Sequence, residues 1–219
     1  MIQMFGVSKS YGPNCTALEE ISLGITRGDF VFLTGPSGAG KTTLLRLLIA
    51  AEPPTRGQII VNGRNLSRLR PAELSHYRRQ LGIIFQQSKF LSHRTVFDNV
   101  AITLQAQGIP NKVVKKRTWE TLQWAGLEEK KEAYPARLSE GERQKVAVAR
   151  ALVDSPLILI ADEPTGNLDE KFAAEIYKLF EEINRRGTTI LFATHARQLA
   201  ERSGRRAIVL RQGQIVESR

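Results

Sequence analysis

The spacing of apolar residues divides the chain into three parts. In the first third, short apolar or alternating stretches are separated by glycine and proline, which predicts strands at MIQMFGV (1–7), LEEISLGI (18–25), FVFLT (30–34) and QIIVNG (58–63). The middle, about 88–155, has apolar residues at helical spacing, which predicts helices at 96–107, 112–126 and 141–153. Pro110, Gly126 and Pro135 are expected to end these helical stretches.

The last third alternates between strand and helix patterns. Strands are predicted at 157–161 and 188–194, helices at 170–186 and 196–204, and a hairpin at 206–218. Strands that alternate with helices indicate an α/β fold with a largely parallel sheet covered on its faces. The helical middle is then an insertion. We expect a single domain over 1–219, with a core formed by 1–87 and 156–219 and a helical subdomain at 88–155.

Composition and charge limit the class of partner but do not identify a single one. Lysine and arginine total 32 against 22 aspartate and glutamate, so the formal charge is +10. This excess favours an anionic partner such as a nucleotide, a nucleic acid or an acidic membrane face. The single cysteine and the absence of a secretion pattern predict a cytoplasmic protein. No apolar run reaches the roughly 18 residues of a spanning helix, so any membrane crossing would belong to another chain.

The strand at 30–34 leads into a phosphate-binding pattern. The pattern G-x-x-x-x-G-K-[ST] is matched, between a strand and an apolar helix, by Gly35, Pro36, Ser37, Gly38, Ala39, Gly40, Lys41 and Thr42. Glycines let backbone N–H groups point at phosphate, and the helix start adds a partial positive charge. Lys41 supplies a charge for the β and γ phosphates, and the Thr42 hydroxyl is placed to bind Mg²⁺. The alternative is a glycine-rich turn with an incidental Lys-Thr pair.

Two carboxylates end another apolar strand. In LILIADEP (157–164), Asp162 and Glu163 follow the strand where open α/β sheets place their ligands. Because successive side chains diverge, we assign Mg²⁺ binding to Asp162 and activation of the attacking water to Glu163. A strand that ends in solvated acids is the alternative. His195 ends TILFATH in the same way and is a candidate for γ-phosphate contact and water positioning.

The stretch LSEGER (138–143) has two interpretations. Ser139 followed by Glu142 forms a potential capping box at the start of the helix over 141–153. The same helix start could instead face an anion. Whether the chain carries an anion at another site decides between these interpretations.

Five motifs, in the order in which they stand along the chain, resemble those of the ATP-binding cassette (ABC) ATPases. The resemblance covers essentially the whole chain. Beside the phosphate loop and the carboxylate pair stand Gln86 in IIFQQ, LSEGE at the signature position, and GNLD ending at Asp169. His195 matches the family's switch histidine, and Tyr11 matches its adenine-stacking aromatic. Taken alone, Tyr11 would be an ordinary strand-end aromatic and Gln86 a solvated loop residue.

The resemblance implies an ABC ATPase fold with an antiparallel β subdomain, the cofactors ATP and Mg²⁺, and a homodimer. Two cassettes pair head to tail, so that Ser139 and Gly141 of one subunit face the γ phosphate held by the other. It implies catalytic roles for Glu163, His195 and Gln86, and metal binding by Thr42, Gln86 and Asp162. The implied ATP-binding residues are Tyr11, residues 35–43 including Thr43, Ser139, Gly141 and Asp169.

Glu140 departs from the family pattern, which has glycine at that position. A carboxylate near a triphosphate is repulsive by about 1 kcal/mol at short range. We expect Glu140 to point aside and to weaken the closed dimer without abolishing it. The implied phosphate contacts, Ser139 and Gly141, are both present.

Among branches of the family, SGAGKTTLL, HRTVFDNVAI and IADEPTGNLD are most similar to the cell-division ATP-binding proteins. They are a little less similar to lipoprotein-releasing and macrolide-efflux cassettes. The resemblance implies a transmembrane partner resembling FtsX, control of peptidoglycan hydrolysis, and a peripheral location at the inner face of the cell membrane. The partner's coupling helix is expected in a groove around 86–100, floored by Phe85, Phe90, Leu91 and Phe97, unless these are simply subdomain core.

Two other functions compete with this one. The chain could be the ATPase of a solute, lipoprotein or macrolide transporter, which only the partner distinguishes. It could also be a soluble nucleic-acid-associated ABC protein, for which the basic charge is the only support. We expect no specific nucleic acid, because tandem cassettes and long coiled coils are not present in this sequence.

Overall fold

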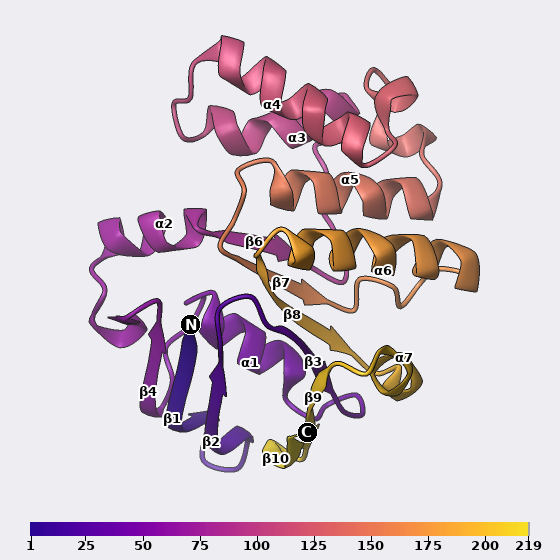
Figure 1. Ribbon diagram of the computed structural model, residues 1–219. Coiled ribbons are helices and arrows are strands. Elements are labelled where there is room, and N and C mark those ends of the chain that lie inside the picture. The colour runs from indigo at the N-terminus through magenta and orange to yellow at the C-terminus, as the bar shows by residue number, and fades with distance from the viewer. Residues whose placement is uncertain (219) are drawn as a thin grey trace.

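The computed structural model describes residues 1–218 and contains two sheets with helices packed around them (Figure 1). The larger sheet has the strand order β10-β9-β3-β8-β7-β6. Its strands are β3 (Phe30–Thr34), β6 (Leu81–Ile84), β7 (Ile158–Asp162), β8 (Thr189–Thr194), β9 (Arg206–Arg211) and β10 (Gln214–Ser218). Neighbours run parallel except β9 and β10, which form the terminal hairpin. The predicted mainly parallel α/β core is therefore confirmed.

The smaller sheet is antiparallel and has the order β2-β1-β4-β5. Its strands are β1 (Ile2–Ser10), β2 (Thr16–Ile25), β4 (Arg56–Val61) and β5 (Arg64–Asn65). This sheet is the antiparallel part that the resemblance implied. It packs on one face of the larger sheet together with helix α1 (Lys41–Leu48), through one continuous apolar cluster.

Alternation along the strands gives the larger sheet two apolar faces. Val31 and Leu33 of β3 belong to the cluster beneath α1, whereas Phe30 and Phe32 belong to the cluster on the opposite face. The second cluster is covered by α5 (Glu140–Leu152) and α6 (Glu170–Arg185). Every residue of β3, β7 and β8 is buried. Strands buried on both faces give the nearly continuous apolar runs seen in the sequence.

Three helices form a layer beyond α6 with an apolar core of their own (Figure 1). They are α3 (Val96–Gln105), α4 (Asn111–Trp124) and α5, and α5 also packs against β6 and α6. The remaining elements are α2 (Pro71–Arg79), α7 (Arg197–Ser203) and short 3₁₀ turns at Leu66–Arg68, Glu128–Lys130 and Pro135–Arg137. Within the described chain, no helix combines the length and apolar character needed to span a membrane.

Helix α2 and strand β6 had no counterpart among the predicted elements, and neither had the two-residue strand β5 or the short 3₁₀ turns. Strand β6 has four residues, and Gly82 at its second position weakens the strand pattern. The structure explains this glycine: a Cβ at Gly82 would lie 2.6 Å from the carbonyl oxygen of Ala151 on α5. Close packing of α5 on the edge strand therefore requires a residue without a side chain there.

Candidate functional site

The loop between β3 and α1 closes around the ammonium group of Lys41. Lys41 Nζ donates hydrogen bonds to the carbonyl oxygens of Gly35 at 2.7 Å and Pro36 at 3.2 Å. The side chain is buried, although lysine is rarely buried without partners. The first turn of α1 has no acidic residue, so its N-terminus keeps its partial positive charge. The loop is thus an electropositive, preformed cradle.

Two glycines of this loop are required by close contacts. Gly40 has φ 104°, and a Cβ there would lie 2.6 Å from the carbonyl oxygen of Ala17 on β2. Gly35 has φ 149°, and a Cβ there would overlap the carbonyl oxygen of Leu210 on β9. The loop is therefore held between β2 and β9, and the sequence requires glycine for space as well as for backbone conformation.

Asp162 lies at the C-terminal end of β7 and faces the start of α1. The Thr42 hydroxyl donates a hydrogen bond of 2.9 Å to Asp162 Oδ2. Burial raises the pKa of the Asp162 carboxyl; the Thr42 hydrogen bond opposes this rise, and the neighbouring charge of Glu163 adds to it. An ionised Asp162 in this position is costly unless a cation lies close by. Thr42 and Asp162 together offer the oxygen ligands that Mg²⁺ prefers.

Glu163 has an unusual backbone and a constrained side chain. Its φ is 48°, in the left-handed region that costs a non-glycine residue energy, and such strain concentrates at functional sites. Its amide donates to the carbonyl oxygen of Ala193 on β8 at 2.9 Å, which anchors this conformation.

The carboxylate of Glu163 lies between two nitrogen groups. Oε1 is 3.8 Å from Lys41 Nζ, and Oε2 is 3.0 Å from His195 Nδ1. The distance to His195 is that of an ion pair, yet within residues 1–218 the buried Oε2 atom accepts no hydrogen bond. A hydrogen bond needs alignment as well as distance, so the two atoms are close without being hydrogen-bonded. Oε2 is thus a buried acceptor with capacity left for a water molecule.

These side chains open into one cavity of about 390 Å³. It is lined by Ala17, Ser37, Gly38, Ala39, Gly40, Lys41, Thr42, Thr43, Gln86, Asp162, Glu163 and His195. The structure therefore brings together most of the predicted site residues from β3, α1, β6, β7 and β8. The loop residues, Lys41 and the two carboxylates all line this cavity. Such a cavity suits a polyphosphate with a divalent cation between the phosphates and the acids.

Six predicted residues lie outside this lining. Gly35 and Pro36 instead accept the hydrogen bonds of Lys41 through their carbonyl oxygens, and the other four lie farther along the chain or before the loop. The Tyr11 hydroxyl donates to Glu52 Oε1 at 2.6 Å, and its ring is half-exposed. Ser139 and Gly141 lie at the start of α5, and Asp169 caps α6 by accepting a hydrogen bond from the amide of Phe172. None of the four lines the cavity within its own chain.

Both predicted hydrogen bonds of the capping box at Ser139 are present. Ser139 Oγ accepts from the amide of Glu142 at 3.2 Å, and Glu142 Oε2 accepts from the amide of Ser139 at 2.8 Å. The hydrogen bond from the Ser139 amide lowers the pKa of Glu142. Glu140 is exposed and pairs with Arg143 at 3.7 Å, so its carboxylate lies beside its own helix.

Sequence reasoning missed two supports of the cradle. Ala17 on β2 lines the cavity, and Gly213, in the turn between β9 and β10, donates its amide to the carbonyl oxygen of Ala39 at 3.1 Å. The hairpin was predicted, but its contact with residues some 170 positions earlier was not. The left-handed conformation of Glu163 also has no signal in the sequence.

Comparisons with known proteins all find similarity to ATP-binding cassette proteins. The family model described as ABC transporter matches residues 18–166. The cell division ATP-binding protein FtsE of Bacillus subtilis is 43% identical, covering 99% of this chain and 95% of that protein. The methionine import ATP-binding protein MetN of Photorhabdus laumondii is 42% identical, covering 99% of this chain and 64% of that protein. The ATP-binding cassette MJ0796, solved as a post-hydrolysis dimer bound to ADP and Pi, has a TM-score of 0.91 at 33% identity and covers 100% of this chain and 98% of that chain.

Replacing Asp162 by Asn should stabilise the protein at neutral pH when no ligand is added. Burial raises the folded-state pKa of Asp162, so the ionised carboxylate destabilises the fold above that pKa. Asn keeps an acceptor for Thr42 without the charge. Urea denaturation should show a higher free energy of unfolding for Asp162→Asn at pH 7. The gain should vanish below about pH 4, where aspartate is protonated in both states. A less stable variant at pH 7 would contradict this account.

Proposed function

Because the chain belongs to the ABC transporter family and is an ATP hydrolase of that family, we propose that it works as a cell-division ATPase. In this proposal it binds Mg²⁺-ATP in the cavity beside Lys41, closes as a head-to-tail homodimer, and acts on a transmembrane partner resembling FtsX. The proposal treats 1–219 as one ATPase domain, with the nucleotide core in 1–87 and 156–219 and the helical part in 88–155. The observation that carries the catalytic part is the buried Oε2 of Glu163, 3.0 Å from His195 and left without a hydrogen bond.

The residues around the cavity fit a nucleoside triphosphate. The cradle of residues 35–43 offers backbone amides and the Lys41 ammonium to the β and γ phosphates. In this proposal the base stacks on Tyr11, in keeping with the role that the resemblance to ABC ATPases implies for that residue. The Tyr11 ring is half-exposed, its hydroxyl is bonded to Glu52, and Lys9 Nζ lies over the ring at 5.2 Å from its centroid. Stacking of an adenine would therefore use the face of the ring opposite Lys9.

The donor set also fits Mg²⁺. Thr42 and Asp162 offer a hydroxyl and a carboxylate 2.9 Å apart, and Gln86 at the end of β6 adds an amide oxygen. Among residues 1–218, no group of three or more His, Cys, Asp and Glu side chains could hold a metal. Such a sparse protein site suits an ion that keeps phosphate and water ligands. When bound, Mg²⁺ would neutralise charge that develops on the phosphates.

In this site Glu163 acts as the general base. Its Oε2 accepts a proton from a water molecule, whose oxygen attacks the γ phosphorus as the bond to the β-phosphate oxygen breaks. His195 Nδ1 lies 3.0 Å from the same Oε2, and its exposed ring would contact the γ phosphate and help to position the attacking water. Gln86 completes the site from β6. Lys41 holds the transferred group in line through its fixed ammonium.

The proposed dimer would supply the implied ATP-binding residues that do not line the cavity of their own chain. Ser139, Gly141 and Asp169 belong to the implied ATP-binding set, yet none lines the cavity of its own chain. A second copy placed head to tail would bring the start of its α5 to the open side of the cradle. The similarity to MJ0796, a cassette solved as a dimer with ADP and Pi, supports this arrangement.

The surface proposed for the membrane partner lies after β6. Phe85 is 51% exposed and Leu91 is 39% exposed, whereas Phe90 and Phe97 pack partly into the helical layer. The backbone of Leu91 is fixed, because its amide and carbonyl both hydrogen-bond to the buried side chain of Asn99. The fixed backbone would hold the exposed Leu91 side chain in place for a partner. The proposed floor of the groove therefore reduces to Phe85 and Leu91.

A solute transporter remains the second candidate function, because MetN is nearly as similar in sequence to this chain as FtsE is. The coverage favours FtsE, since the chain spans 95% of that relative but 64% of MetN. The relatives described here supply no support for nucleic-acid binding. The location proposed for the chain is the cytoplasmic side of the inner membrane, where its partner would hold it.

Replacing Glu163 by Gln should slow ATP hydrolysis by about 100-fold or more, because an amide cannot accept the water's proton. ATP binding should persist, and the ATP-bound dimer should accumulate in size-exclusion chromatography. Lys41→Ala is the matched control and should instead lose nucleotide affinity. Full turnover by Glu163→Gln would reject the assignment of the base.

Replacing Glu140 by Gly should tighten ATP-dependent dimerisation. The dimer contains two such sites, so removing about 1 kcal/mol of repulsion at each, about 2 kcal/mol in all, corresponds to a dissociation constant lower by roughly 30-fold. Glu140→Gln removes the charge without adding a glycine to α5, so it should tighten the dimer as well. Sedimentation at low and high salt would measure both variants, and the effect should shrink in high salt. Unchanged or weaker dimerisation of both variants would count against the repulsion.

Affinity purification of the tagged chain from solubilised membranes should recover a transmembrane protein resembling FtsX. Phe85→Ala should reduce the recovery severalfold, because it truncates the exposed docking side chain. Val216→Ala, at another exposed apolar position on β10, should leave recovery unchanged. Recovery of a solute permease in place of the expected partner would favour the transporter alternative.

A further inference from the structure

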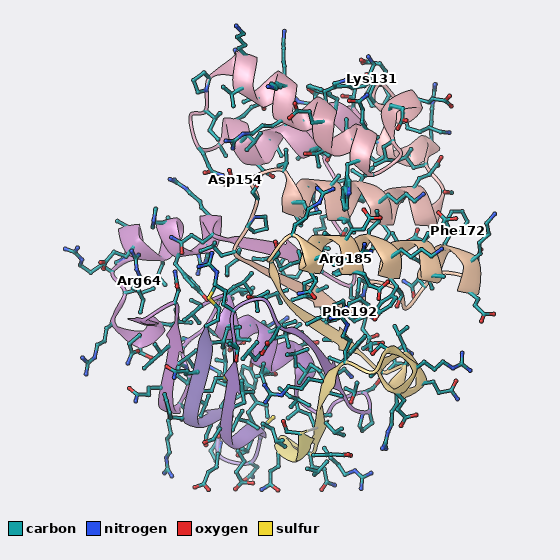
Figure 2. The ribbon with its side chains drawn as sticks, in the orientation of Figure 1. Arg64, Lys131, Asp154, Phe172, Arg185 and Phe192 are labelled. Carbon is teal, nitrogen blue, oxygen red and sulfur yellow. The ribbon has the colours of Figure 1, made fainter. Side chains whose placement is uncertain are left out.

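The start of α5 and the start of α6 lie next to each other, with Phe172 between them. In Figure 2, Phe172 is labelled beside the right-hand ends of these two helices, where both begin. These ends carry Ser139 and Gly141 on α5, and Asp169 on α6. Phe172 lies in the first turn of α6, so it belongs to the chain segment that Asp169 caps.

The ring of Phe172 packs directly on Gly141. A Cβ built at Gly141 would lie 2.8 Å from Cγ and 2.9 Å from Cε1 of Phe172, closer than real Cβ atoms approach. The ring therefore occupies the space where any side chain at position 141 would lie. On the other side, the backbone amide of Phe172 donates to Asp169 Oδ1 at 2.8 Å. One residue thus contacts both predicted partner-facing positions.

The packing of Phe172 differs from that of a core residue. Among the described residues, the apolar clusters on both faces of the sheet and in the helical layer do not include it. Leu179, two turns later on α6, does pack against the core. One turn after Phe172, the Glu175 carboxylate forms an ion pair with Lys145 on α5, with 2.9 Å between Oε2 and Nζ. The two helices are therefore joined by this ion pair at their second turns, one turn beyond the contact between Phe172 and Gly141.

We propose that Phe172 is a positioning residue for the trans half of the ATP site. Its ring fixes the distance between the turn at Ser139–Gly141 and the loop ending at Asp169, so that both meet the second copy as one unit. This inference rests on the proposed head-to-tail dimer. Catalytic contacts tolerate little displacement, and a misplacement of about 1 Å can cost about 100-fold in rate. A residue that sets this distance would act on turnover without touching nucleotide.

The test is a double-mutant cycle in the full-length protein. Gly141→Ala introduces the clash with the ring, and Phe172→Ala removes the ring. Each single variant should lower kcat and ATP-dependent dimerisation by about 10-fold or more, with nucleotide affinity of the isolated subunit unchanged. The double variant should be more active than Gly141→Ala, because the added methyl then has space. Phe172→Tyr keeps the ring and should keep wild-type dimerisation.

Leu179→Ala is the matched control, since it truncates an apolar side chain on the same helix away from Gly141. It should lower the thermal midpoint, because it removes apolar packing against the core. It should leave kcat within about twofold, because it does not change the position of Gly141 relative to Asp169. If the losses of kcat in the two single variants simply add in the double variant, and the wild type dimerises normally, the role of Phe172 is overturned but the proposed dimer is not. A wild type that hydrolyses ATP without dimerising would overturn the proposed dimer and this inference together.

Discussion

The structure depends on holding ionised groups at the end of apolar strands. Lys41 is buried between the carbonyl oxygens of Gly35 and Pro36, and Glu163 lies 3.8 Å from its ammonium. Buried charges are tolerated only where partners compensate the loss of water. Strands β3, β7 and β8 supply the rigid frame, because they are buried throughout and fixed in register by parallel pairing. Moving any of these strands would leave a charge without its partner.

Most of the fold could be predicted because its signals are local. The buried strands are apolar runs, the covering helices repeat at helical spacing, and glycine or proline marks their ends. Strand β6 was missed because the packing of α5 requires Gly82, and a glycine in a four-residue strand removes the pattern that identifies it. Helix α2 was missed because its one buried residue, Tyr77, gives no periodicity.

The candidate site was predictable where neighbouring residues in the sequence form it. Residues 35–43 and the pair at 162 and 163 lie within two short motifs, and the structure places residues 37–43 and the pair around one cavity. Contacts between distant segments left no signal, as with the Gly213 amide bonded to Ala39 and the Gly141 contact with Phe172. The left-handed Glu163 was also unpredictable, because tertiary contacts impose that conformation.

The capping box at Ser139 has a consequence for the entropy of closure. Ser139 Oγ uses a lone pair to accept the amide of Glu142, which holds the side chain in one rotamer. A hydroxyl that accepts in this way still has its own proton to donate. In the proposed dimer, that proton can reach a phosphate oxygen without breaking the cap or freezing a mobile side chain. The same hydrogen bond that begins the helix would thus lower the ordering cost of assembling the site.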